Sequence, residues 1–468
     1  MNLNMMRSGR VGKGWMLRVG AVGMGVCVVV GGLALAVMGG STEMVAPSRY
    51  IAIGGGLKAD NARVLDSLVN KETKGKVVIV PFASGDQAGA AKNAIELLKA
   101  RAPDARFIVL PDPLKDAESR DLAIAWIPTA DLVYFTGGDQ SRITKRFLTD
   151  GKPNALLSAL HDGMLRNGTP VAGTSAGAAV LCDPMFTGGG SDAALGLPGA
   201  APEVDADDSD AQLMEPPAGA APTGTSAPGK EGTGAEAKGA AKPVVGPRLG
   251  PGLGLVRNVL LDTHFFSRGR LGRLVAAVEK HPSKVGIGLA DNRAVLIAGS
   301  NFTAMGDAAC LVVNGRATRR EGLDRLNVRV TLLNDHDMMR FWPRYGEEAG
   351  APAGEVDREP AFGTQMARVD RVPEAIGLIP AVKPPAAADG AGDAKAKAPA
   401  AEGAWDRGVV LAMLYRLAAD PATAQVCSSE KFSITLSADE KTQFYADKEK
   451  VSRVTIVNAK LDVREKKP

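Results

Sequence analysis

Residues 170–181 read PVAGTSAGAAVL, and the GTSAG pentapeptide at 173–177 decides how the surrounding chain folds. A short apolar run before it and an alanine-rich stretch after it predict a strand, a sharp turn and a helix. Such a turn lifts the Ser175 hydroxyl out at the end of a sheet and points the free N–H groups of the helix toward it. The motif predicts a nucleophilic serine with a backbone oxyanion site; the alternative is a tight turn with a capping serine.

Apolar strands and amphipathic helices alternate around this motif. Strands are expected at 50–53, 76–80, 106–110 and 131–135, and helices at 62–69, 88–101 and 155–166. Strands at 259–261, 285–289 and 294–298 are expected to continue the same sheet, with a helix at 271–280. This alternation predicts an α/β fold with a mostly parallel sheet and helices on both faces. Ligands bind at the carboxyl ends of such strands, where we expect the glycines at 54–56 to pack closely beneath the site.

The composition divides the chain into segments. Residues 200–248 predict a disordered insertion rich in Ala, Gly and Pro, and residues 383–404 a low-complexity linker, because neither can bury enough apolar surface to fold. They separate two parts of a catalytic α/β domain, 48–199 and 249–382, from a C-terminal region at 405–468. That last region is expected to hold a helix and a small antiparallel piece.

The N-terminal residues 1–47 have the charge pattern of an export signal. Four basic residues precede an uncharged run at 19–41, namely Arg7, Arg10, Lys13 and Arg18. This pattern predicts a secretory signal peptide or an N-terminal membrane anchor, the alternative being a buried core helix. We therefore expect a protein that is periplasmic, extracellular or anchored to a membrane by this segment.

Composition also excludes some classes of function. The formal net charge is +4 and aromatic residues make up 4%, which argues against a nucleic-acid partner. Beyond Cys27 in the export segment, Cys182, Cys310 and Cys427 are too scattered for a disulfide framework or a zinc site, and Cys182 is expected in the core. No metal or cofactor is expected.

A serine nucleophile needs a base, and the chain has 4 histidines. His161 falls within an expected helix, His281 at a helix end, and His336 in an irregular polar segment. His264 directly follows an apolar strand and is the best candidate base by elimination. Asp291, at the end of the next strand, is the best candidate to orient the imidazole, with Asp262 as the competitor.

The chain order Ser175, His264, Asp291 differs from that of the α/β-hydrolases, in which the acid precedes the histidine. This order argues against an ordinary esterase or lipase. The motifs FTGGDQ (135–140), GTSAGA (173–178), DTHF (262–265) with RLGRL (270–274), and GIGLAD (286–291) resemble those of the S51 serine peptidases, in particular the cyanophycinases. The resemblance covers residues 50–315 apart from the insertion.

The resemblance implies a class I glutamine amidotransferase-like fold and a homodimer. It implies Ser175 as nucleophile, His264 as base, and Asp291 where the family typically has glutamate. Backbone N–H groups at Gly138 and Ala176 would form the oxyanion hole. The residues implied to bind substrate are Asp139, Gln140, Asp262, Thr263, Arg268 and Arg270, with Thr263 standing where cyanophycinases usually carry glutamine.

The implied reaction is hydrolysis of cyanophycin, multi-L-arginyl-poly-L-aspartate, to β-Asp-Arg dipeptides. Arginine side chains suit the carboxylates of such products, and Asp139 or Asp262 would face the substrate guanidinium. Three alternatives remain open: an aspartyl or isoaspartyl dipeptidase of the same family, a non-catalytic envelope-anchored binding protein, and a metal site at Asp262 and His264.

Overall fold

The computed structural model describes residues 48–196, 246–299, 301–340, 366–379, 408–429, 431–447 and 453–467. The predicted export segment, nearly all of the predicted insertion and the predicted linker lie outside these residues. No helix in the described ranges is both long and apolar enough to span a membrane.

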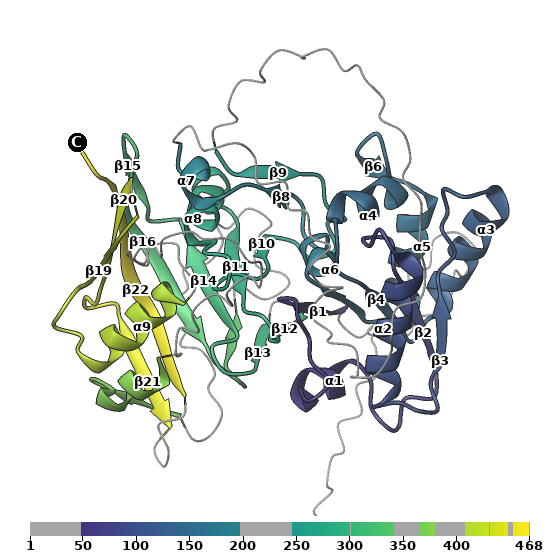
Figure 1. The fold of residues 1–468 in the computed structure, drawn as a ribbon, viewed down its shortest axis with the longest axis horizontal. Helices are drawn as coiled ribbons and strands as arrows, with labels where there is room; N and C mark the ends of the chain where they lie inside the picture. The colour runs from purple at the N-terminus through teal and green to yellow at the C-terminus, as the bar shows by residue number, and fades with distance from the viewer. Residues whose placement is uncertain are drawn as a thin grey trace, which may run out of the picture. The chain divides into compact units, whose positions relative to one another are not determined.

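The first sheet has eight strands in the order β17-β13-β12-β1-β7-β4-β2-β3 (Figure 1). Its parallel strands are β1 (Arg49–Ile53), β7 (Val171–Thr174), β4 (Leu132–Phe135), β2 (Lys76–Val80) and β3 (Arg106–Val109). Its antiparallel strands are β12 (Ala294–Ala298), β13 (Asn301–Met305) and β17 (Met338–Arg340). The predicted mixed α/β architecture with a mostly parallel sheet is thus confirmed for this part of the chain.

Helices cover both faces of this sheet because its strands carry apolar side chains on both faces. Within β2, Val77 and Ile79 pack in one cluster with α1 (Ala62–Leu68) and α2 (Gln87–Lys99). The alternate residues Val78 and Val80 pack in another cluster. The helices of that second cluster are α3 (Ala117–Trp126), α4 (Gln140–Phe147), α5 (Ala155–Asn167) and α6 (Ala176–Ala179).

The second sheet has ten strands and is mostly antiparallel. Its main path is β10 (Val259–Asp262), β11 (Val285–Leu289), β14 (Cys310–Asn314), β16 (Asp324–Leu333), β22 (Val454–Glu465), β20 (Phe432–Ser437) and β19 (Gln425–Ser428). Off this path lie β15 (Arg319–Glu321), β18 (Met366–Val369) and β21 (Gln443–Asp447). The remaining short elements are η1 (Ile127–Thr129), β5 (Leu148–Thr149), β6 (Lys152–Pro153), β8 (Met185–Gly188), α7 (Ser191–Ala194), β9 (Arg248–Gly250) and η3 (Pro373–Leu378).

The prediction that the strands at 259–261, 285–289 and 294–298 all continue the first sheet is wrong for two of them. The strand at 294–298, β12, lies in that sheet as an antiparallel neighbour of β1, whereas β10 and β11 pair in parallel within the second sheet. The expected C-terminal strands β20 and β22 pair antiparallel, as predicted, and they do so within the larger second sheet. This sheet too is covered on both faces: Leu260 lies in a buried cluster that includes residues of α8 (Leu271–Lys280) and α9 (Val409–Ala419), and Leu261 lies in the cluster of the first sheet.

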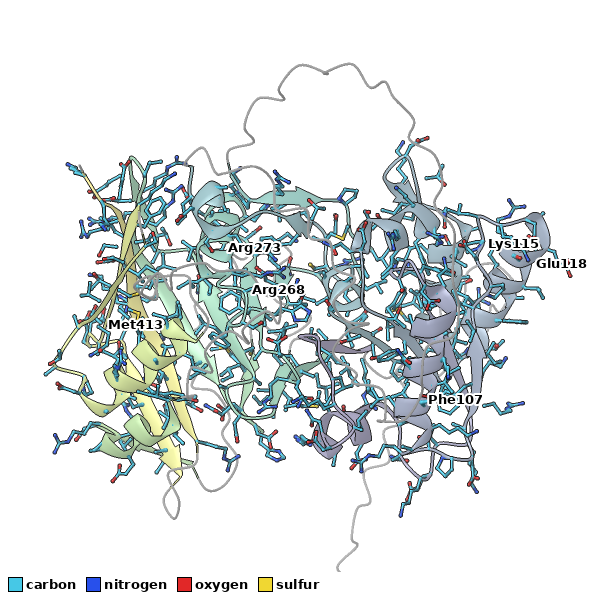
Figure 2. The ribbon with its side chains drawn as sticks, viewed as in Figure 1. Phe107, Lys115, Glu118, Arg268, Arg273 and Met413 are labelled. Atoms are coloured by element: carbon cyan, nitrogen blue, oxygen red, sulfur yellow. The ribbon has the colours of Figure 1, made fainter. Side chains whose placement is uncertain are left out.

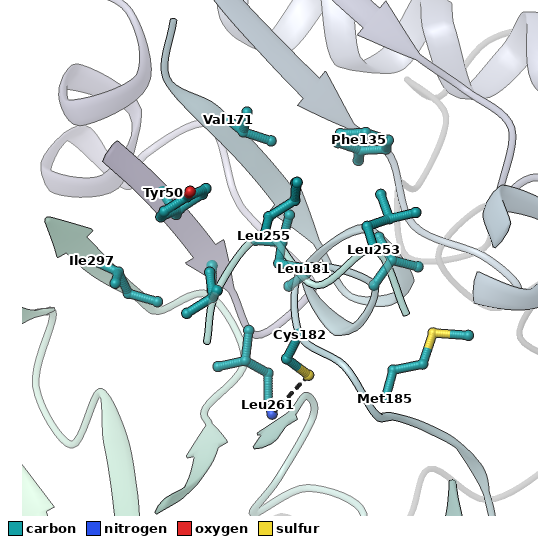
Figure 3. Close-up of a cluster of buried hydrophobic side chains, with 14 of the residues drawn as sticks. Tyr50, Phe135, Val171, Leu181, Cys182, Met185, Leu253, Leu255, Leu261 and Ile297 are labelled. Atoms are coloured by element: carbon teal, nitrogen blue, oxygen red, sulfur yellow. Dashed lines mark hydrogen bonds between the residues drawn. The ribbon is translucent and has the colours of Figure 1, made fainter. Parts of the chain in front are cut away.

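A buried cluster joins the segment after α6 to β10 (Figure 3). Cys182 is buried in it, and its Sγ accepts a hydrogen bond from the Leu261 N–H at 3.4 Å. The N–H groups of Leu253 and Val256 donate to the carbonyls of Val180 and Leu181, both at 2.8 Å. Burial raises the pKa of the Cys182 thiol to about 11, as expected for a core cysteine. These contacts hold the segment after α6 beside β10.

Candidate active site

Ser175 lies in a strained turn between β7 and α6. Its backbone has φ +50° and ψ −118°, and its N–H donates to the Ile53 carbonyl at 3.0 Å. A Cβ on Gly173 would stand 2.0 Å from the Gly177 carbonyl oxygen, and one on Gly177 would stand 2.4 Å from that of Phe135. Only glycine fits these two positions, so the motif's small residues are required by the tight packing of the turn.

The Ser175 hydroxyl binds His264 rather than capping its helix. Its Oγ lies 2.9 Å from Nε2 of His264, and it makes no side-chain capping bond to α6. Both side chains are buried, with 1% of Ser175 and 4% of His264 exposed. His264 follows β10 with a φ of +49°, and its N–H donates to the Gly54 carbonyl at 2.8 Å. This is the hydrogen-bond contact that a serine nucleophile and its base require.

Asp291 binds the other nitrogen of the imidazole. Its Oδ1 is hydrogen-bonded to Nδ1 of His264, which it reaches from the end of β11, the parallel neighbour of β10. Burial acts to raise the pKa of Asp291, but hydrogen bonds from His264 and Ser267 and the positive charge of Arg268 hold it below its usual value. An ionised Asp291 fixes the imidazole tautomer that can accept a proton at Nε2.

Asp262 takes no part in this chain of hydrogen bonds. Its buried carboxylate accepts from Nε and Nη2 of Arg273 at 2.8 and 2.6 Å, and from Nη1 of Arg270 at 3.4 Å. This two-point contact with Arg273 is internal to the protein and has no exposed carboxylate surface. The geometry therefore assigns Asp262 a role in holding α8, and it leaves no face for a substrate guanidinium or a metal ion.

The other residues implied to bind substrate have different degrees of access. Arg268, labelled in Figure 2, is exposed, and its positive charge acts on Asp291. Arg270 is buried and donates to the Thr263 carbonyl at 2.7 Å, and Thr263 is itself 5% exposed. Arg268 is thus the cation best placed to meet a substrate.

Asp139 and Gln140 lie at the start of α4, after strand β4. Asp139 is the N-cap residue, and its carboxylate accepts from the Ser141 N–H at 2.8 Å. The Gln140 amide donates to the Phe186 carbonyl at 2.8 Å. Both are partly exposed, so each combines a structural contact with access to solvent.

Gly138 and Ala176, the expected oxyanion donors, stand at the carboxyl ends of the adjacent strands β4 and β7. Gly138 has a φ of +132°, and a Cβ there would lie 2.4 Å from the Ala83 carbonyl oxygen. Ala176 is the first residue of α6, where a backbone N–H has no partner within the helix. Both positions are compatible with N–H groups that bind an oxyanion.

Three further residues support this site, and sequence reasoning missed the role of two of them, Arg273 and Ser191. Arg273 binds Asp262, stacks over the Phe186 ring at 5.0 Å, and donates to the Gly189 carbonyl at 3.0 Å. Ser191 receives N–H bonds from Gly272 and Arg273 and so caps α8 from another segment. Gly55 packs against the His264 ring, in line with the expectation that the glycines at 54–56 lie beneath the site. An arginine at the start of a helix after DTHF was a signal for Arg273, whereas the role of Ser191 depends on contacts between distant segments.

The other three histidines lie on other elements. His161 is on α5 and His281 ends α8, and burial lowers the pKa of both. The Nδ1 atom of His336 lies 3.0 Å from the Arg63 guanidinium. In the part of the chain that the structure describes, no three His, Cys, Asp or Glu side chains are grouped to hold a metal ion.

The chain is similar to proteins of one peptidase family. Residues 50–198 match the model of peptidase family S51. The cyanophycinase of Synechococcus elongatus is 27% identical over 240 residues, 49% of this chain and 58% of that protein. The cyanophycinase of Geminocystis herdmanii is 28% identical over 243 residues, 52% of this chain and 70% of that protein. The chain thus spans little more than half the length of the first of these relatives.

Two solved structures are also similar. A peptidase from an acI-B1 actinobacterium aligns with a TM-score of 0.38 and 15% identity, covering 64% of this chain and 98% of that one. A putative peptidase E protein from Listeria monocytogenes EGD-e aligns with a TM-score of 0.32 and 12% identity, covering 55% and 98%. The family match and the cyanophycinase relatives support a serine-type peptidase.

Proposed function

We propose that this chain, an S51-type serine peptidase, is an exopeptidase that hydrolyses cyanophycin to β-Asp-Arg dipeptides. The observation that carries the proposal is the continuous hydrogen-bonded series from Ser175 Oγ to His264 Nε2, at 2.9 Å, and from His264 Nδ1 to Asp291. Such a series activates a serine hydroxyl for attack on an amide carbonyl.

The proposed reaction uses this geometry in two stages. Ser175 Oγ attacks the amide carbon while its proton passes to Nε2 of His264, and Asp291 stabilises the resulting imidazolium. N–H groups of Gly138 and Ala176 bind the developing oxyanion. His264 then gives the proton to the leaving amine, and a water molecule hydrolyses the acyl-enzyme in the reverse sense.

The substrate class is supported by the charge beside the triad. Arg268 is exposed, and its positive charge reaches Asp291. A guanidinium at this place suits the free carboxylates of cyanophycin, which belong to its arginine residues and its chain end, since the aspartate side chains are amide-bonded to arginine. Asp262 no longer contributes to this argument, because its carboxylate binds Arg273; Asp139, partly exposed, remains the candidate partner of a substrate guanidinium.

An aspartyl or isoaspartyl dipeptidase is the second candidate. The observation that favours it is the engagement of Asp262 with Arg273, which removes one of the two acidic groups expected to face a substrate arginine. Short Asp-containing peptides need a cation for their carboxylate but no partner for a guanidinium.

One experiment separates these functions. Purified protein is incubated with cyanophycin and, separately, with aspartyl and isoaspartyl dipeptides, and the products are identified by mass spectrometry. Release of β-Asp-Arg from cyanophycin supports the first proposal, and cleavage of the dipeptides alone supports the second. No cleavage together with no labelling of Ser175 by a serine-directed covalent inhibitor would favour a non-catalytic binding protein.

Export and a homodimer remain part of the proposal. The export segment lies outside the described residues, so its basic flank and uncharged run are the support for a periplasmic, extracellular or membrane-anchored location. Cell fractionation tests the location, and light scattering of the purified protein tests the dimer.

A further inference from the structure

We propose that Asn61 and Asn292 are positioning residues that hold Asp291 against His264. The inference rests on the proposed function, because it concerns the same triad. It is drawn from a set of hydrogen bonds between two loops, the one after β1 and the one after β11.

Asn292 is the centre of this contact. It has a φ of +54°, and its N–H donates to the Gly55 carbonyl at 2.7 Å. The Asn61 side-chain amide donates to the Asn292 carbonyl at 2.6 Å and to its Oδ1 at 3.1 Å. The Lys58 N–H donates to the same Oδ1 at 3.0 Å. The residue directly after Asp291 is therefore held by polar contacts on its N–H, its carbonyl and its side chain.

The loop that holds Asn292 also holds the base. The Gly54 carbonyl accepts from the His264 N–H at 2.8 Å, and the Gly54 N–H donates to the Arg293 carbonyl at 2.9 Å. Gly55 packs against the imidazole ring. The loop after β1 is thus a common support for His264 and Asp291, and it fixes their separation.

Asp291 needs this support because its own side chain is short and 37% exposed. An aspartate has only two side-chain torsions, so the position of its carboxylate follows the position of its backbone. A small movement of residue 292 would carry Oδ1 away from Nδ1 of His264. Displacements of about 1 Å at such positions cost roughly a hundredfold in rate.

Asn61 also caps helix α1, since its Oδ1 accepts from the Val64 N–H at 3.1 Å. The substitution Asn61→Ser keeps an N-capping oxygen and the neutral charge but removes the amide that reaches Asn292. Asn154→Ser is the matched control, because Asn154 caps α5 in the same way and its amide donates to the Arg146 carbonyl at 2.8 Å.

We expect Asn61→Ser to lower kcat about tenfold with little change in KM, and Asn154→Ser to change kcat less than about twofold. The acid limb of the kcat/KM profile of Asn61→Ser should move to lower pH, because a displaced carboxylate stabilises the imidazolium less. Wild-type kcat and pH profile in a folded Asn61→Ser variant would overturn the proposal. So would equal losses in both variants without movement of the acid limb, since that result indicates a general loss of capping.

A second variant tests the other side of the contact. Asn292→Gly keeps a residue suited to positive φ and the N–H that binds Gly55, but it removes the Oδ1 acceptor. It should reproduce the change in the pH profile, and an unchanged profile would count against the role of Asn292. The rate at which a serine-directed inhibitor labels Ser175 gives the same comparison without any peptide, so the test remains valid if cyanophycin is not the substrate.

Discussion

Gly55 and His264 are in such close contact that a Cβ on Gly55 would stand 2.1 Å from Cε1 of the imidazole. Gly55 lies in the loop after β1 of the first sheet, and His264 lies directly after β10 of the second sheet. The imidazole ring of the candidate base nevertheless packs directly against Gly55. Any side chain at this position must displace the imidazole, and with it the contacts to Ser175 and Asp291.

Gly55→Ala should therefore lower kcat/KM by about a hundredfold or more. Gly56→Ala is the matched control, because both glycines have positive φ but a Cβ on Gly56 would meet only Asp291 Oδ1 at 4.0 Å. Alanine at 55 also carries the greater backbone strain, because φ is +109° at Gly55 and +56° at Gly56, so the comparison tests the clash with His264 together with that strain. Equal activities would show that the ring tolerates the added methyl group.

Asp291→Asn should lower kcat by about a thousandfold or more, because an amide cannot hold the tautomer that accepts a proton at Nε2.

The pKa of Asp291 is below its usual value of 3.8, so its ionised form stabilises the fold above that pH. The difference in unfolding free energy between wild type and Asp291→Asn should therefore shrink as the pH falls below 3.8. Urea unfolding at several pH values measures it, and a difference that grows toward acid pH would contradict this assignment.

Asp262→Asn should destabilise the fold by about 3–5 kcal/mol, since it leaves the buried Arg273 guanidinium without a counter-charge. Asp162→Asn, which removes an exposed partner of Arg166 on α5, should cost less than about 0.5 kcal/mol. Urea unfolding compares the two. A small effect of Asp262→Asn on stability together with a large effect on KM would instead indicate that Asp262 binds substrate.

Asp337 provides a pH effect outside the site. Burial raises the pKa of Asp337 to about 6. Hydrogen bonds from Thr455 and from the Asn334 N–H favour the carboxylate and lower the pKa, but their effect is smaller than that of burial. The folded protein thus binds a proton more tightly than the unfolded chain, and stability should fall as the pH rises from 3.8 to about 6. Asp337→Asn should remove this dependence and stabilise the protein at pH 7 by on the order of 2 kcal/mol, as measured by urea unfolding at both pH values. A variant with the wild-type pH dependence would assign the effect to another group.

Local patterns were sufficient to predict most individual elements. The continuous apolar run of β2 and the periodic pattern of α8 match the structure residue for residue. Ser175 could be identified because a turn without room for Cβ atoms requires glycines, which are visible in the local sequence at Gly173 and Gly177. His264 and Asp291 could be named because each follows an apolar strand, and the structure brings both to Ser175.

The pairing of strands could not be predicted in the same way. Val259–Asp262 is apolar enough for either sheet, and its partner is set by packing against α8 and the Cys182 cluster. The ion pair between Asp262 and Arg273 could not be predicted for a similar reason, since it depends on how α8 packs on β10. The support of His264 by Gly55 depends on residues far apart in the chain.

The most direct test of the central claim is turnover by Ser175→Ala. Wild type and variant are compared for peptide release from cyanophycin and Asp-containing dipeptides, after circular dichroism has shown that both are folded. The account predicts release by wild type and none measurable by Ser175→Ala. Turnover by the folded variant at a rate near that of wild type would contradict it.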